Sequence, residues 1–157
     1  KEVEPGDITN REGHAAKVYF NALWGKDFSR RDETVENGAL NYGYAVILSA
    51  CNREIAASGY MTQIGLFHDN IFNPFNLGSD LMEPFRPFVD EIVFELTAQG
   101  EAELNTATKS RLIRVLYVDT YFSKVTRPLS VGLSMTMASL AKCYAKEQKK
   151  LVVPLLK

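Results

Sequence analysis

One histidine and two carboxylates lie close together in residues 66–87, LFHDNIFNPFNLGSDLMEPFRP. Asp80 and Glu83 follow His68 by 12 and 15 positions, and their own i, i+3 spacing places them on one face of a helix. An imidazole with carboxylates offers nitrogen and oxygen ligands that suit Mn²⁺ or Mg²⁺. The same residues also fit a D-x-x-E capping pattern, in which Asp80 would accept from backbone N–H groups. The residue types alone leave a metal site and a helix cap both open.

Glu12 presents the same choice near the start of the chain. Thr9 and Glu12 have the spacing of a T-x-x-E capping box. Glu12 also falls at the end of the stripe that a helix here should bury, formed with Ala16, Tyr19 and Leu23. Because a carboxylate on a buried stripe is costly unless it is paired or bound to a metal, Glu12 is a third candidate ligand.

The elements that would position these residues are mostly helices. We expect helices over residues 10–23, stopped by Gly25, and from an N-cap at Asp32 to about Gly59. Further helices are predicted over about 80–98, 106–114 and 130–149, and the first turns of the 80–98 helix contain Pro84 and Pro87.

The second helix is apolar on nearly every face, which is typical of a central, buried helix. Asn37 and Asn41 lie on one side of it at i, i+4, and a buried amide needs hydrogen-bond partners. The stretch around residues 115–129 is rich in β-forming residues. The sequence therefore predicts an all-α, multi-helix domain with a long central buried helix and a small β-hairpin near 115–129.

The composition fits one globular domain. The chain has 157 residues, of which 46% are hydrophobic and 24% charged, and it contains no apolar run long enough to span a bilayer. Its first residues include neither an initiator Met nor an apolar segment like that of a signal peptide, so we interpret them as the start of a fragment. Cys51 and Cys143 fall in apolar helical patterns, which indicates buried thiols in a reducing compartment.

The charge is divided unevenly along a chain whose net charge is −1. Residues 106–157 hold ten basic and two acidic residues, whereas residues 1–105 hold eight basic and 17 acidic residues. An acidic body with a basic end suits a metal site beside a polyanion track, although a solvated helix face would give the same pattern. The candidate contacts to a DNA backbone are Lys109, Arg111, Arg114, Lys142, Lys146, Lys149 and Lys150.

Three blocks in order, REGHAAKVYFNALWG, ENGALNYGYAVILSACNREI and GLFHDNIFNPFNLGSDLMEPFRPFVD, closely resemble the CRISPR-associated integrase-endonuclease of spacer acquisition, the Cas-one family of type II-like systems. The resemblance implies that Glu12, His68 and Glu83 are the catalytic residues and hold Mg²⁺ or Mn²⁺. It implies that Asp80, Asn41 and Arg86 line the site or support it. For Arg86 we favour an ion pair with Glu83 or Asp90 over contact with a phosphate.

The resemblance implies a function as well. Residues 1–157 would be the helical C-terminal catalytic domain, without the family's N-terminal β-rich domain, of a cytoplasmic prokaryotic protein. The reaction would be metal-dependent strand transfer of prespacer DNA into the CRISPR repeat, with hydrolysis when water replaces the 3′-hydroxyl. The implied partners are DNA, a second copy in the full-length protein, a Cas-two family protein, and type II effector and accessory adaptation proteins, with no membrane. The alternatives are a nuclease with no role in integration, and a helical interaction module whose acidic residues are caps.

Overall fold

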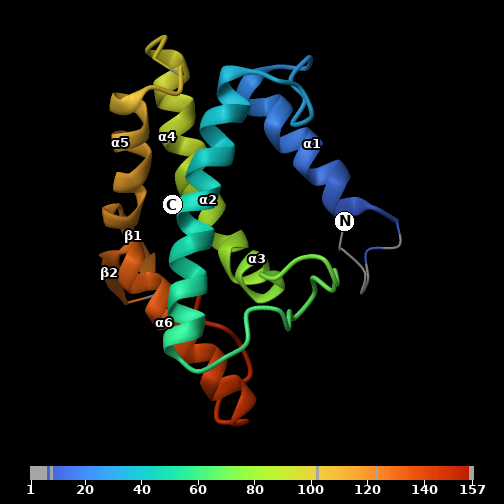
Figure 1. Cartoon of the computed structure of the whole chain (residues 1–157), viewed down its shortest axis with the longest axis vertical. Helices are drawn as coiled ribbons and strands as arrows, with labels where there is room; N and C mark the ends of the chain where they lie inside the picture. Colours follow the sequence, from blue (N-terminus) through green and yellow to red (C-terminus); the bar gives the residue numbers. More distant parts are fainter. Residues whose placement is uncertain (1–6, 8, 102, 123, 156–157) are drawn as a thin grey trace.

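The computed structural model describes residues 7, 9–101, 103–122 and 124–155. Helices form nearly all of its regular structure, and a two-stranded antiparallel hairpin is the sheet found in this part of the chain (Figure 1). The elements are α1 (Arg11–Trp24), α2 (Val35–Ala57), α3 (Asn76–Met82), the 3₁₀ turn η1 (Glu83–Phe85), α4 (Arg86–Ala98), α5 (Thr106–Ile113), the 3₁₀ turn η2 (Arg114–Tyr117), β1 (Asp119–Phe122), β2 (Val125–Pro128) and α6 (Leu129–Tyr144). The predicted mostly helical fold with a small hairpin is confirmed.

Helix α2 is the centre of the domain, as predicted, and packs against α3, α4, α5 and α6 (Figure 1). Leu40, Ile47 and Ile55 are completely buried on it. The expected N-cap at Asp32 is wrong: the hydroxyl of Thr34 accepts from the Asn37 N–H at 3.2 Å, so α2 begins at Val35. One face of α2 is exposed, at Asn41, Ala45, Ser49 and Arg53.

The single helix predicted over 80–98 is instead two helices joined by η1. Pro84 has no N–H for the helical ladder, and its ring would clash with the carbonyl four residues earlier, which belongs to Asp80. The chain therefore tightens into a 3₁₀ turn and restarts as α4, where Pro87 occupies the first turn and costs little. This break places Glu83 at the junction of α3 and η1.

The hairpin packs directly on α6. A Cβ atom at Gly132 would approach Phe122 to 2.7 Å, so glycine allows β1 and the helix to come this close. Helix α6 ends at Tyr144, earlier than the predicted residue 149. Lys146 adopts a left-handed φ of 60°, and its N–H and that of Glu147 donate back to carbonyls of the last turn, which closes the helix.

Helix α1 stands on the side of α2 opposite to α5 (Figure 1). The predicted buried stripe is wrong, because no residue of α1 is fully buried in this chain. Aromatic contacts hold its end to the domain: Trp24 stacks with Phe20 and Phe28 and meets Phe94 edge to face. The Phe20 and Phe28 rings are tilted against each other. The Tyr19 hydroxyl donates to the buried Asp90 carboxylate at 2.9 Å.

No helix in the described part of the chain is long and apolar enough to cross a membrane.

Cys51 is a buried free thiol and Cys143 a half-buried one. Burial raises the pKa of the Cys51 thiol to about 12. The prediction of a buried thiol is therefore confirmed for Cys51, whereas Cys143 is only half-buried.

Candidate active site

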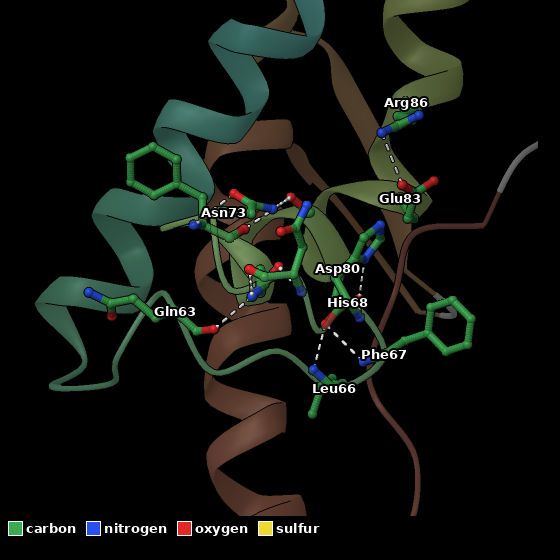
Figure 2. A network of polar contacts seen from close by, with 12 residues as sticks. Gln63, Leu66, Phe67, His68, Asn73, Asp80, Glu83 and Arg86 are labelled. Atoms are coloured by element: carbon green, nitrogen blue, oxygen red, sulfur yellow. Dashed lines mark hydrogen bonds and ion pairs between the residues drawn. The ribbon is translucent and has the colours of Figure 1, made fainter. Parts of the chain in front are cut away.

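His68 is oriented by Asp80. The His68 Nδ1–H donates to Asp80 Oδ1 at 2.6 Å, and the carboxylate is 7% exposed (Figure 2). Since an ionised carboxylate can only accept, this bond fixes the proton on Nδ1 and leaves the Nε2 lone pair of a neutral ring available. A carboxylate behind the imidazole is the arrangement that orients histidine ligands in metalloproteins.

Asp80 also holds the loop that carries His68. Its two oxygens accept backbone N–H groups of Leu66, Phe67 and His68, the last two at 3.1 Å (Figure 2). Partial burial alone would raise the pKa of Asp80, but the bonds from His68 and these N–H groups outweigh it and lower the pKa. Asp80 therefore stays an anion and fixes both the backbone and the ring of His68.

Two residues that the sequence analysis did not single out support this loop. A Cβ at Gly65 would lie 2.2 Å from the His68 carbonyl oxygen and 2.8 Å from Asp80 Oδ2, so no side chain fits there. Asn76 is buried, and its amide nitrogen donates to the carbonyls of Gln63 and Asn70 at 3.0 Å each. Gly65 lies in the sequence IGLF and Asn76 in FNLG, and neither pattern indicates a chemical role, which is why sequence reasoning missed both.

Glu83 pairs with Arg86 beside the histidine. The two side chains lie 3.0 Å apart at i, i+3, as expected for Arg86, and Figure 2 shows them next to His68. Burial raises the pKa of Glu83, while Arg86 and His68 oppose the rise and the carboxylates of Glu12 and Asp80 add to it. Glu12 and His68, the two other predicted ligands, are therefore both close enough to affect the pKa of Glu83.

Glu12 reaches the same pocket from α1. An open pocket of about 740 Å³ is lined by Glu12, His68, Asp80, Glu83, Arg86 and the neighbouring Gly13, Ala15, Ala16, Leu66 and Phe67. Three segments far apart in sequence therefore bring together the three predicted ligands and two of their three predicted supports. Within the described residues, no three His, Cys, Asp or Glu side chains already stand at metal-ligating geometry.

The donor set fits a divalent cation nevertheless. It combines one oriented imidazole with two carboxylates on one open pocket, and both carboxylates have exposed surface. The ion pair between Glu83 and Arg86 is half-exposed and worth about 1 kcal/mol or less, so it opposes a move of Glu83 towards a cation only weakly.

The capping alternatives are wrong in their predicted form. Asn10 occupies the N-cap of α1 with no side-chain capping bond, and the Asp7 carboxylate accepts from the Arg11 and Glu12 N–H groups at 2.7 and 3.0 Å. Asp80 lies inside α3 and accepts from the 66–68 loop rather than from the start of its own helix. Neither Glu12 nor Asp80 is thus a cap of the predicted kind.

Asn41, predicted to line the site, does not line this pocket. It is exposed on α2, and its oxygen accepts from Arg30 Nη2 at 2.7 Å. Of the two ion-pair partners predicted for Arg86, the structure shows Glu83. Asp90 instead accepts from the hydroxyls of Tyr19 and Tyr44.

The seven basic residues predicted to contact DNA do not line the pocket. Lys109 and Arg111 are on α5, where the Lys109 ammonium lies 5.8 Å from the Tyr42 ring centre and Arg111 pairs with Glu101 at 3.1 Å. Arg114, Lys142, Lys146, Lys149 and Lys150 are exposed in η2, in α6 and after it. The predicted helix face of lysines is not formed, because α6 ends before Lys146. Contact of all seven with DNA stays a prediction.

Comparisons with known proteins identify the family of this chain. A family model described as CRISPR associated protein Cas1 matches residues 3–127, which is most of the chain. The chain belongs to the Cas1 family. Among curated Cas1 proteins, the CRISPR-associated endonuclease Cas1 of Neisseria meningitidis serogroup C is 46% identical over 118 residues, 74% of this chain and 39% of that protein.

A second Cas1 relative and a solved structure extend the match along the chain. CRISPR-associated endonuclease Cas1 2 of Pyrobaculum aerophilum is 33% identical over 145 residues, 88% of this chain and 48% of that protein. A casposase bound to integration product has the same fold, with a TM-score of 0.79 at 22% identity over 95% of this chain and 53% of that one. The chain therefore spans about half the length, or less, of the relatives it matches.

Proposed function

We propose that this Cas1 chain is the helical catalytic domain of a metal-dependent DNA endonuclease and integrase that inserts spacer DNA into a CRISPR array. The observation that carries the proposal is the shared pocket, where an imidazole oriented by Asp80 faces the same space as Glu12 and Glu83. The family to which the chain belongs supports the same activity.

Glu12, His68 and Glu83 would hold Mg²⁺ or Mn²⁺ through two carboxylates and the Nε2 atom of His68. A divalent cation bound there supplies Lewis-acid stabilisation of the negative charge that develops on a phosphoryl oxygen. Asp80 keeps the His68 proton on Nδ1, so that Nε2 remains a ligand. Arg86, released from Glu83, places a guanidinium on the wall of the pocket where it can pair with a phosphate.

The nucleophile decides the product. When a DNA 3′-hydroxyl attacks the phosphorus of the repeat backbone, a new phosphodiester bond forms and the old bond to the repeat's 3′-oxygen breaks. When water attacks, the same bond breaks and the strand is hydrolysed. The open pocket, about 740 Å³ in volume, has room for a strand beside the ligands. The partners that we propose are prespacer and repeat DNA, a second Cas1 copy and a Cas-two family protein, in the prokaryotic cytoplasm.

The test combines metal binding with DNA products. Glu12→Gln, His68→Ala and Glu83→Gln should each remove calorimetric Mn²⁺ binding and DNA strand transfer while circular dichroism stays unchanged. Glu91→Gln, an exposed carboxylate on α4 outside the pocket lining, is the matched control. Folded variants that bind Mn²⁺ and join strands normally would contradict the assignment.

The form of the product separates integration from simple hydrolysis. Branched, covalently joined DNA supports the integrase, whereas nicks and shortened strands alone support a nuclease with no role in integration. An interaction module would form neither product and would not respond to metal. Substitution of Glu12 or Glu83 would then change only the free energy of unfolding.

A further inference from the structure

The loop between α2 and α3 carries two adjacent apolar side chains that the domain leaves almost uncovered. The loop spans residues 58–75 and is the green connection that projects beyond the helices in Figure 1. Ile71 is 91% exposed and Phe72 is 90% exposed, more than any other large hydrophobic residue in the described part of the chain. We call this pair the apolar tip. Neighbouring apolar side chains exposed to this degree add almost nothing to the core and mark a binding surface.

The apolar tip is held on a rigid turn. The Asn70 carbonyl accepts from the Asn73 N–H at 2.9 Å, and the Asn70 side-chain oxygen accepts from the Phe72 N–H at 2.9 Å. Asn76, which is buried at the start of α3, donates to the same Asn70 carbonyl at 3.0 Å. The turn is therefore fixed to the domain without help from the tip side chains. A contact that is already ordered loses little conformational entropy when it binds a partner.

The apolar tip lies close to the candidate active site along the chain. Phe72 follows His68 by four residues, so their Cα atoms are at most about 14 Å apart. On the other side of His68, Leu66 and Phe67 are exposed and line the active-site pocket. Because successive phosphates of one strand are spaced about 3.4 Å apart along the axis of a duplex, a duplex with one phosphate at His68 passes the tip within a few base pairs.

The composition of the loop favours contact with bases over contact with phosphates. Residues 58–79 contain no Lys and no Arg, and Asp69 is an exposed carboxylate two positions before Ile71. Such a segment has no cation with which to neutralise a phosphate. Apolar side chains, Ile and Phe among them, can instead insert between two base pairs, where they unstack the step and kink the duplex.

We propose that Ile71 and Phe72 form a wedge that enters the target duplex beside the phosphate under attack and unstacks one base step. This inference rests on the proposed function and adds a way in which the protein deforms its DNA substrate. The kink exposes the backbone next to His68 to the ligands of the active site. Since pyrimidine–purine steps unstack most easily, the wedge also favours strand transfer next to such a step.

The experiment measures 2-aminopurine fluorescence, which rises when the base is unstacked. The probe is a branched duplex with the structure of a strand-transfer product, kept in EDTA so that no chemistry occurs, with 2-aminopurine at successive positions on either side of the branch. The wild type should raise the fluorescence several-fold at one step. Ile71→Ser/Phe72→Ser should abolish this rise and weaken binding by about tenfold in fluorescence anisotropy. The dependence of binding on salt should stay unchanged, since no phosphate contact is lost.

Two control variants separate the wedge from a general loss of apolar surface. Ile113→Ser/Tyr117→Ser removes one Ile and one aromatic ring from exposed positions on α5 and η2, outside the active-site pocket, and should behave like the wild type. Ile71→Leu/Phe72→Leu keeps apolar side chains that can enter a base step and should retain the rise in fluorescence. Circular dichroism should be the same for all variants, because the tip side chains lie outside the core.

Three results would overturn the proposal. The first is a wild type that binds the duplex without raising the fluorescence at any step. The second is a rise that persists in Ile71→Ser/Phe72→Ser. The third is a dimer of the wild type in sedimentation without DNA that the same variant loses, because the tip would then bind a second copy of the chain. Failure of the proposed function would instead appear as absent metal binding and absent strand products, whereas a wild type that joins strands without unstacking a base refutes this inference alone.

Discussion

Asp80→Asn should damage the active site by changing the His68 tautomer. The substitution keeps the size of the side chain but replaces one carboxylate oxygen with an NH₂ group. In the wild type, Asp80 Oδ2 accepts from the Leu66 and Phe67 N–H groups, and Oδ1 accepts from the His68 N–H and Nδ1–H. If the amide oxygen keeps the first pair of bonds, its NH₂ group faces His68 Nδ1.

A donor opposite Nδ1 moves the ring proton to Nε2, which then has no lone pair for a metal. Loss of such an orienting partner lowers metal affinity by about 10- to 100-fold, equal to about 1.4–2.7 kcal/mol. The backbone N–H of His68 also loses its acceptor. Because the Asp80 side chain is 7% exposed, this unsatisfied N–H should also lower the free energy of unfolding, by about 1–3 kcal/mol.

Two assays check this reasoning. Calorimetric Mn²⁺ titration measures the affinity, and the ¹⁵N chemical shifts of the His68 ring report which nitrogen carries the proton. Asp69→Asn is the matched control, since it removes the same charge from an exposed neighbour of His68. Unchanged Mn²⁺ affinity in Asp80→Asn, or a ring still protonated on Nδ1, would refute the argument. An equal loss in Asp69→Asn would show that charge rather than orientation is responsible.

Three further predictions follow from the same site and its supports. Gly65→Ala should disrupt the 66–68 loop, because its Cβ would lie 2.2 Å from the His68 carbonyl oxygen, and it should weaken Mn²⁺ binding at least tenfold in calorimetry; wild-type affinity would contradict the steric argument. Arg86→Gln should tighten Mn²⁺ binding by about 3- to 10-fold by freeing Glu83 from a half-exposed pair worth about 1 kcal/mol, yet weaken DNA binding; looser metal binding would show that Arg86 supports the site instead. Burial raises the pKa of Asp90 above its ordinary 3.8, so the folded state binds the Asp90 proton more tightly than the unfolded state does. The stability that this proton contributes is full below pH 3.8 and is lost as pH rises through the pKa of Asp90 in the folded state. Urea unfolding should therefore show the wild type losing stability relative to Asp90→Asn as pH rises from 3.8 towards neutrality, by at most about 1.4 kcal/mol per pH unit, and a difference independent of pH would contradict the raised pKa.

Helix positions and the identity of the candidate ligands could be predicted from the sequence, because both depend on local information. The periodicity of apolar residues identifies α2, α4 and α6. The ordered blocks around Glu12, His68 and Glu83 carry the family resemblance. Helix ends were less predictable, since Thr34 rather than Asp32 caps α2, and Pro84 divides the predicted third helix.

Only the tertiary structure decided what surrounds those ligands. Asp80 has the sequence of a cap, but the loop at 66–68 folds against it and supplies three backbone N–H groups and the His68 ring. Arg30 drew no attention in the sequence, and its guanidinium is held in place only because α2 presents the amide oxygens of Asn37 and Asn41 to it and α1 places the Phe20 ring against it. A side chain's charge and hydrogen-bonding capacity are written in the sequence, whereas its partners are set by which distant segments pack beside it, and those partners decide whether the same carboxylate caps a helix, orients a histidine or holds a metal.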